Sequence, residues 1–332
     1  MVTLNDIARI SGFSRATVSL VLRDSPLVAA GTKATILNVI KETGYIYNRR
    51  AANLRASRSH TVGLVIPELV NPVYAQLVSG AEAELEKLGQ AVFIANTNES
   101  QERQQRFLQR MLEQGIDGLL ICPAIGTSGD VFTPFHNASI PVIQLLRSAD
   151  KNVNYVGSDN RRGIRMITEH LIALGHRRLA FIGSSIAISV SQNRLLGFRD
   201  ALDEAGLVFD PSYVRTSSPD IEEAISVTRE LLSIKLPPTA IVCFNDPIAF
   251  GAIFGVCDCG LTPGVNISVT GFDDIPTAAS WRPPLTTVSI NARHIGSQAG
   301  LLLRDLLEKF TPETRTIVID PKIIIRQTSG LA

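Results

Sequence analysis

The sequence predicts a small all-α helix-turn-helix domain followed by a two-lobed α/β body with a parallel sheet in each lobe. Three observations support this division. Nine basic and three acidic residues fall in the first 60 positions, whereas the rest of the chain has 23 basic and 28 acidic residues. Short helical patterns fill the basic segment, and apolar runs alternating with amphipathic helices fill the remainder. A length of 332 residues suits two or three domains.

The basic segment carries the signals of three short helices. Thr3 and Asp6 form a capping-box-like pair at the start of the first helix. Gly12 permits the left-handed backbone of a tight turn, and Ser14 is a good N-cap for the second helix. A third helix is expected over residues 32–43. A helix, a glycine turn and a second helix form the unit that places a recognition helix in the DNA major groove.

The second helix would bury its apolar side and leave a polar face exposed. On that face Arg15 has the geometry for a bidentate contact with guanine, while Ala16 and Leu20 suit thymine methyl groups. The alternative is a three-helix subdomain with an unused basic surface, although the charge asymmetry independently favours DNA binding. The residues expected to contact DNA from this domain are Thr3, Ser14, Arg15, Ala16, Thr17, Ser19 and Leu20.

The segment N-R-R-A-A-N-L-R-A at residues 48–56 is basic and alanine-rich. It suits a hinge helix that forms on docking, with Leu54 as a wedge in the minor groove. A flexible basic linker is the alternative. Asn48, Arg49, Ala51 and Leu54 are the DNA contacts expected here. The predicted domains are therefore residues 1–47 for the helix-turn-helix, 48–60 for the hinge and linker, and 61–332 for effector binding and dimerisation.

The body contains continuous apolar runs of the kind found in parallel sheets that are covered on both faces. These runs are residues 62–66, 91–95, 118–122, 179–183, 240–244 and 267–272. Ligands of open α/β sheets bind beyond the carboxyl ends of the strands. Polar residues follow several of these runs, and together with a nearby arginine they suit the hydroxyl groups of a sugar or nucleoside. The expected effector-binding residues are Asn71, Tyr74, Arg194, Asn245, Asp246, Asp273 and Trp281.

Some of these polar residues also have a purely structural interpretation. Asp159 and Asp274 suit helix caps, and Asn71 followed by Pro72 suits a turn. His176 lies between a predicted helix and a strand, where a structural role fits better than that of a general base. For each residue taken alone, the structural and the functional interpretations stay open.

Several functional classes find no support in the sequence. It has no G-x-S-x-G elbow, no phosphate-binding G-x-x-x-x-G-K-[ST] loop and no H-E-x-x-H motif, so no catalytic residue is predicted. The four cysteines lack metal-ligand or disulfide spacing and are expected to be reduced, buried thiols, and no metal or cofactor is predicted. No apolar run approaches membrane-spanning length, and the N-terminus does not resemble an export signal, which favours the cytoplasm.

Ordered motifs along nearly the whole chain resemble the LacI/GalR family of bacterial transcription repressors. They include T-L-N-D-I-A-R-I-S-G-F-S-R-A-T-V-S, G-Y-I-Y-N-R-R-A-A-N-L, S-D-N-R-R-G, L-G-H-R-R-L-A-F-I-G, F-N-D and V-T-G-F-D-D. Tyr47 and Asn53 depart from the family's hinge pattern, in which proline and then arginine or glutamine are usual. T-V-S-L-V-L and C-F-N-D-P-I-A-F-G-A-I-F-G are most similar to the branch that contains a maltose-system repressor.

This resemblance implies a repressor that binds a near-palindromic operator as a homodimer, under the control of a small effector such as a sugar or related polar metabolite. The family's effector contacts fall on Arg194, Asp273 and the Asn245–Asp246 pair, with Asn71 and Tyr74 in the first lobe. The resemblance also implies a body like that of periplasmic binding proteins, with lobes of residues 61–159 with 293–321, and 160–292 with 322–332. The segment before Arg194 shows no second arginine, which favours a neutral effector over a strongly anionic one. The alternatives are an exported or cytosolic sugar-binding receptor without regulatory DNA binding, or an enzyme.

Overall fold

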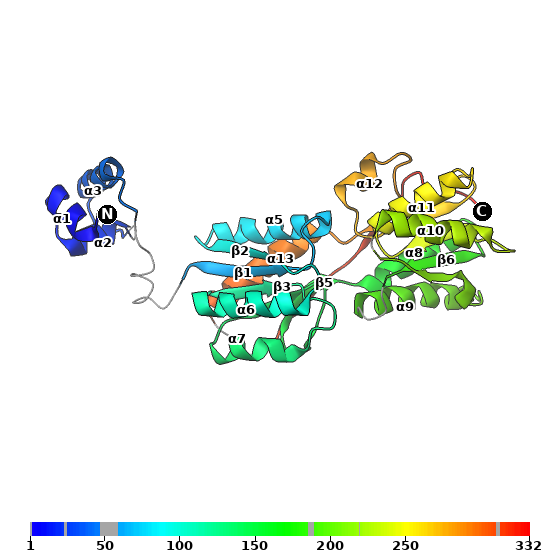
Figure 1. Ribbon diagram of the computed structural model, residues 1–332, viewed down its shortest axis with the longest axis horizontal. Coiled ribbons are helices and arrows are strands. Elements are labelled where there is room, and N and C mark those ends of the chain that lie inside the picture. Colours follow the sequence, from blue (N-terminus) through cyan, green and yellow to red (C-terminus); the bar gives the residue numbers. More distant parts are fainter. Residues whose placement is uncertain (1, 23–24, 47–58, 185–188, 219, 310–312) are drawn as a thin grey trace. The chain divides into compact units, whose positions relative to one another are not determined.

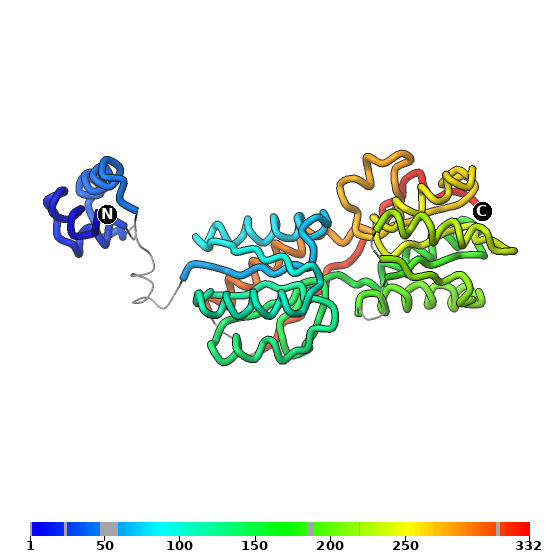
Figure 2. Tube along the Cα trace, in the orientation of Figure 1, coloured from blue at the N-terminus to red at the C-terminus, as the bar shows by residue number. Residues whose placement is uncertain are grey.

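The computed structural model describes residues 2–22, 25–46, 59–184, 189–218, 220–309 and 313–332. The chain divides into two compact units, Met1–Ser59 and His60–Ala332, and each is described by itself. Figure 1 labels the elements, and Figure 2 follows the chain through them.

The N-terminal unit contains α1 (Leu4–Ser11), α2 (Arg15–Leu22) and α3 (Ala30–Thr43). Its capping box forms as predicted, because the Thr3 hydroxyl accepts a hydrogen bond from the Asp6 amide while the Asp6 carboxylate accepts one from the Thr3 amide. The third helix begins two residues before the predicted start. Five apolar side chains form the buried core of this unit: Ile7, Val18, Val21, Ile36 and Val39.

The first lobe of the body is built on a six-stranded parallel sheet in the order β11-β5-β4-β3-β1-β2. Its strands are β1 (Thr61–Ile66), β2 (Ala91–Asn96), β3 (Gly118–Ile121), β4 (Val142–Leu145), β5 (Asn154–Ser158) and β11 (Thr316–Ile319). Helices α5 (Pro72–Glu86) and α13 (Ala292–Glu308) pack together on one face. The other face carries α6 (Gln101–Gln114), η1 (Gly129–Phe132) and α7 (Thr133–Asn137), as Figure 1 shows.

The second lobe has a four-stranded parallel sheet in the order β7-β6-β8-β9 and an antiparallel pair, β10-β12. Its strands are β6 (Leu179–Gly183), β7 (Val214–Thr216), β8 (Ala240–Cys243), β9 (Ser268–Thr270), β10 (Thr287–Ser289) and β12 (Lys322–Ile324). Its helices are α8 (Asn160–Ala173), α9 (Ser189–Glu204), η2 (Pro211–Tyr213), α10 (Ile221–Ser233), α11 (Asp246–Asp258) and α12 (Pro276–Ser280). Helix α8 packs against α9, and α10 packs against α11.

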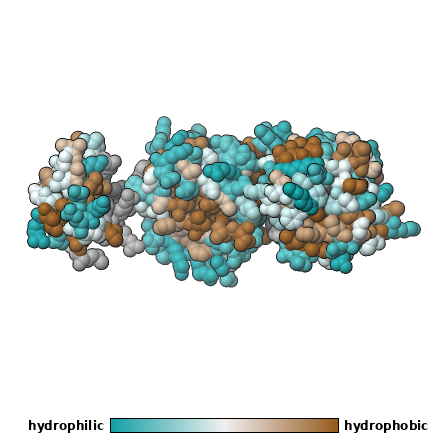
Figure 3. Space-filling view, turned by 90° about the horizontal axis from the view of Figure 1, so that it is seen from above, coloured by the Kyte–Doolittle hydropathy of each residue, from teal (hydrophilic) through white to brown (hydrophobic). Residues whose placement is uncertain are grey.

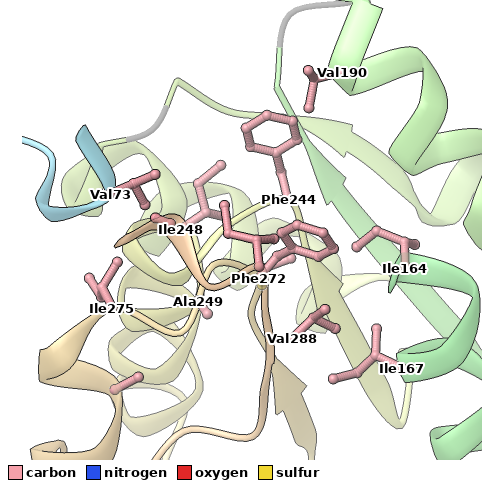
Figure 4. Packing of buried hydrophobic residues seen from close by; sticks show 14 of the residues in the cluster. Val73, Ile164, Ile167, Val190, Phe244, Ile248, Ala249, Phe272, Ile275 and Val288 are labelled. Atoms are coloured by element: carbon pink, nitrogen blue, oxygen red, sulfur yellow. The ribbon is translucent and has the colours of Figure 1, made fainter. Parts of the chain in front are cut away.

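The chain passes between the lobes three times. The crossings lie between β5 and α8, between β10 and α13, and between β11 and β12. Each lobe is therefore assembled from separate segments of the chain. In the second lobe, buried side chains from several elements pack around Phe244 and Phe272, among them Ile164, Ile248 and Val288 (Figure 4).

Two expectations about single residues have different outcomes. The expectation of four buried thiols is wrong for Cys257 and Cys259, which are exposed near the end of α11, whereas Cys122 and Cys243 are buried. His176 has the structural role that its position suggested, because its ring nitrogens contact Thr239 Oγ1 at 2.9 Å and Ser268 Oγ at 3.0 Å. In the described part of the chain, no helix is long and apolar enough to cross a membrane.

Candidate functional site

The start of α2 presents the predicted DNA-reading residues. Arg15 and Ala16 are exposed, whereas Thr17, Ser19 and Leu20 are half-buried. The Ser14 hydroxyl accepts a hydrogen bond from the Thr17 amide at 3.1 Å. Helix α2 is thereby capped at the point where its free amide groups and the Arg15 guanidinium form a positively charged end.

The remaining predicted DNA contacts divide into two groups. Thr3 is exposed, but its hydroxyl is engaged in the capping box, where it donates to Asp6 Oδ2 at 2.7 Å. That hydrogen bond and the one from the Thr3 amide lower the pKa of the Asp6 carboxyl. Asn48, Arg49, Ala51 and Leu54 lie outside the residues that the structure describes.

A cavity of about 370 Å³ lies between the two lobes of the body and takes lining residues from both. Its volume is in the range of small-molecule sites. Five of the seven predicted effector-binding residues line it: Asn71, Tyr74, Arg194, Asn245 and Asp273. Asn71 and Asn245 also serve as helix N-caps, because their side chains accept hydrogen bonds from the amides of Val73 and Ile248. The structural and the binding interpretations of these two residues therefore apply together.

Arg194 of α9 organises the second-lobe wall of the cavity. Only 5% of the residue is exposed, and its guanidinium lies between the rings of Phe244 and Phe272, 4.3 and 3.8 Å from the two centroids. Its nitrogens donate hydrogen bonds to Asn160 Oδ1 at 2.9 Å, to Asp273 Oδ1 at 3.3 Å and to the Phe244 carbonyl oxygen. The rings hold the guanidinium on both faces and the hydrogen bonds hold its edge, so its position is set before a ligand arrives.

Asp273 completes this wall in an unusual environment. Burial raises the pKa of its carboxyl to about 6, although the neighbouring Arg194 guanidinium opposes the shift. Its backbone has a φ of 112°, in the region that side chains other than glycine rarely adopt. Strain of this kind persists where the surrounding structure imposes it, and it is common at binding sites.

Two of the predicted effector contacts do not line the cavity. Asp246 is fully buried beside it and accepts hydrogen bonds from Thr287 Oγ1 at 2.5 Å and from the Ile275 amide at 2.8 Å. Trp281 stacks on Phe250 with 4.2 Å between ring centroids and meets the Phe254 ring edge-on. The expectation that these residues contact a ligand is therefore corrected: Asp246 joins structural elements, and neighbouring rings cover the Trp281 indole.

The first-lobe wall contains an ion pair that sequence reasoning missed. Arg147 Nη1 lies 2.8 and 3.0 Å from the two carboxylate oxygens of Glu99, and Arg147 Nη2 lies 3.4 Å from the Tyr74 hydroxyl. Glu99 has a φ of 58°, and Leu146, immediately before Arg147, has a φ of 60°. The segment before Arg194 contains no second arginine, but the first lobe supplies Arg147 as a second guanidinium at the cavity.

Further lining residues that were not predicted include several side chains near the crossings and the second-lobe rim: Glu68, Ser158, Asn160, Ser217, Ser218 and Glu223. Most follow the carboxyl end of a strand, which is the signal that located Asn71 and Asn245. Carboxylates, amides, hydroxyls and two guanidinium groups can together bind a ligand rich in hydroxyl groups. Among the described residues, no group of three or more His, Cys, Asp or Glu side chains is arranged to hold a metal ion.

Comparison with known proteins accounts for both units. Residues 3–48 match the family described as bacterial regulatory proteins of the lacI family. Residues 59–327 match the family described as periplasmic binding proteins and sugar binding domain of the LacI family. The chain belongs to the LacI family. It is a DNA-binding transcriptional repressor with an effector domain, as the motifs and the two-unit fold predict.

Individual LacI-family proteins resemble the chain over nearly its whole length. The maltose regulon regulatory protein MalI of Escherichia coli K12 is 31% identical, over 97% of each chain. The HTH-type transcriptional repressor PurR of Pasteurella multocida is 27% identical, covering 99% of this chain and 98% of its own. The structure of the lac repressor dimer bound to operator and the anti-inducer ONPF aligns with a TM-score of 0.89 and 26% identity, covering 100% of this chain and 99% of that one. The relatives named here are repressors, which confirms the prediction that the chain is not an enzyme.

Proposed function

We propose that this LacI-family repressor binds a near-palindromic operator as a homodimer and that a small polar effector between the lobes controls its affinity for that operator. The observation that carries the proposal is a cavity lined from both lobes in the same chain as an exposed, capped recognition helix. The resemblance to a lac repressor dimer on its operator supports the symmetry of the complex.

The proposed division of labour follows the sequence. Residues 1–47 read DNA, residues 48–60 act as hinge and linker, and residues 61–332 bind the effector and dimerise. Arg15, Ala16 and Leu20 contact base edges, Thr17 and Ser19 contact phosphates, and Leu54 enters the minor groove. The protein acts in the bacterial cytoplasm, and at the nucleoid when it is bound to DNA.

The outer strand of the first lobe supports the proposed dimer. Strand β2 lies at one edge of the six-stranded sheet, and about half of the surface of Phe93 and of Ile94 on it is exposed, at 51% and 49%. Figure 3 shows apolar side chains gathered on the exposed surface of this lobe. A second copy would cover exposed apolar residues of this kind on an edge strand.

The three crossings supply a route from effector to operator. A ligand that contacts Tyr74 from the first lobe and Arg194 from the second favours one relative placement of the lobes. A change in that placement alters the dimer surface of the first lobe and hence the spacing of the two hinge segments on DNA. The effector then changes operator affinity through contacts it makes in one conformation and lacks in the other.

Selection from randomised duplex DNA by the purified full-length protein, without added small molecule, tests the proposal. We expect a palindrome with a deformable central step, such as C-G, and release of that DNA by an inducer found in a metabolite screen. Enrichment only in the presence of a metabolite would indicate a corepressor. Failure to enrich any site under either condition would contradict the assignment of α2 as the reading element.

A further inference from the structure

The charges that line the cavity are unequal. Four carboxyl groups, Glu68, Glu99, Glu223 and Asp273, face two guanidinium groups, Arg147 and Arg194. Each guanidinium is paired with a carboxylate on its own side: Arg147 with Glu99 in the first lobe, and Arg194 with Asp273 in the second. Glu223 lies at the rim and accepts hydrogen bonds from the Ser218 hydroxyl and the Ser218 amide.

Glu68 is the one lining carboxylate that takes part in none of these interactions. It follows β1 in the loop that leads to Asn71, and it is half-buried. Among the described residues it has neither a hydrogen-bond partner nor a salt bridge. Each of the other three lining carboxylates accepts at least one hydrogen bond from the protein. Burial raises the pKa of Glu68, the Glu99 charge adds to that shift, and Arg147 opposes it. Glu68 thus faces the cavity at an electrostatic cost that Arg147 offsets only in part, because the pKa of Glu68 stays raised.

We propose that the effector carries a positively charged nitrogen that binds to Glu68, and that an amino sugar is the class of ligand that fits the cavity. This inference rests on the proposed function of the cavity as the effector site. The hydroxyl groups of such a sugar can form hydrogen bonds with Asn71, Asn245 and Asp273, while its ammonium group supplies the positively charged partner that Glu68 lacks.

The same charges disfavour the other two classes of effector. An anion would meet guanidinium groups that are already paired with Glu99 and Asp273, and the Glu68 carboxylate would repel it. A neutral sugar can donate a hydroxyl hydrogen bond to Glu68, but the excess negative charge of the cavity then stays uncompensated. An ammonium group is the donor that both forms this hydrogen bond and removes the excess charge.

Calorimetric titration of the full-length protein at neutral pH, above the raised pKa of Asp273, tests this inference. The probes are D-glucosamine, D-galactosamine and D-mannosamine, each compared with its parent hexose, in which a hydroxyl group replaces the ammonium group. We expect at least one amino sugar to bind about tenfold or more tightly than its parent hexose. We expect Glu68→Gln to remove most of that difference, because it removes the charge and keeps the shape of the side chain.

Glu230→Gln is the matched control, because Glu230 is exposed on α10 and does not line the cavity. It should leave both affinities unchanged. Equal binding of an amino sugar and its hexose, unchanged amino-sugar binding by Glu68→Gln, or no binding of any of the three amino sugars would each overturn the inference. A neutral metabolite that binds the cavity and releases the operator would also overturn this inference, but it would support the proposed function. If no metabolite of any charge changes operator affinity, the proposed function itself fails.

Discussion

The DNA-reading unit and the effector-binding body differ in how far apart in sequence their functional contacts lie. In the N-terminal unit, Thr3 caps α1 through Asp6 and Ser14 caps α2 through Thr17, both three residues apart. In the body, Arg194 is paired with Asp273 and Arg147 with Glu99, at separations of 79 and 48 residues. A substitution on α2 should therefore act locally, whereas a substitution at the cavity should alter both ligand binding and the stability of the body.

The largest effect is expected from Arg194→Ala. It leaves the Asp273 carboxylate and Asn160 without their buried partner and opens a space between two phenylalanine rings. We expect the free energy of unfolding of the body to fall by about 3–5 kcal/mol, together with a loss of effector affinity. Denaturant titration and calorimetry measure the two effects. Operator affinity should persist wherever the variant is folded.

Arg161→Ala is the matched control, since Arg161 forms an exposed pair with Asp200 across α8 and α9. Its cost should stay below about 1 kcal/mol. Similar losses for the two variants, or unaltered effector binding by Arg194→Ala, would break the contrast between the buried network and the surface.

Arg15→Ala should produce the opposite pattern. Loss of a bidentate base contact is expected to weaken operator binding by about 1–3 kcal/mol per half-site and to relax sequence preference there. Effector affinity should not change, because Arg15 lies in the N-terminal unit and the cavity is lined by residues of the body alone. Fluorescence anisotropy with operator and with scrambled DNA measures both affinities. Lys41→Ala, on the exposed surface of α3, controls for the loss of one positive charge.

The contribution of Asp273 to the stability of the body and that of Asp6 to the stability of the N-terminal unit should depend on pH with opposite signs. The pKa of Asp273 is raised from its ordinary 3.8 to about 6, so the folded body binds this proton more tightly than the unfolded chain does. Its contribution is therefore most favourable below about pH 4 and is lost as the pH rises through about 6, by up to about 3 kcal/mol. Asp6 has a lowered pKa, so its contribution to the N-terminal unit is present at neutral pH and lost as the pH falls.

The difference in unfolding free energy between the parent protein and Asp273→Asn isolates the contribution of the Asp273 carboxyl. We expect the parent to lose stability relative to this variant between about pH 4 and pH 7. A difference that stays constant over that range would show that Asp273 does not titrate as its burial implies.

The smallest effect is expected from Thr3→Ala. This substitution removes one half of the capping box of α1 and should cost about 1 kcal/mol in the stability of the N-terminal unit. The melting temperature of the body, followed through the Trp281 fluorescence, should not move, because the only tryptophan of the chain lies in the body. A shift of the tryptophan transition would show that the two units do not unfold separately.

The sequence predicts the N-terminal unit better than it predicts the cavity. Helix caps and the Gly12 turn depend on residues a few positions apart, so their patterns are visible in the chain itself. In the body, the six predicted strands all form, including the three-residue β9, which lies within the longer predicted run 267–272. Strands β7, β10 and β12 also have three residues each, but they lie in shorter apolar runs and were missed. Strands β4, β5 and β11 belong to the first sheet and were also missed.

The cavity residues divide in the same way. Asn71, Asn245 and Asp273 were found because they come after predicted strands, and Arg194 because its motif resembles that of the family. Arg147 follows the missed strand β4, and its pairing with Glu99 depends on left-handed backbone at two positions occupied by ordinary side chains. No local sequence pattern predicts a contact of this kind between distant residues. Trp281 was assigned to the ligand as an aromatic ring that could stack on it, and Asp246 by its place after a strand and by the resemblance. The folded chain uses Trp281 for packing and Asp246 for joining structural elements.

The central claim is that occupation of the cavity changes affinity for DNA. It is tested most directly by measuring the operator affinity of the full-length protein with and without the compound that most raises its melting temperature among hexoses, amino sugars and nucleosides. The account predicts a change of about five- to 150-fold for the parent protein and for Arg161→Ala. It predicts little or no change for Arg194→Ala, which lacks the central side chain of the cavity. Saturation of the parent protein with ligand at unchanged operator affinity would contradict the claim.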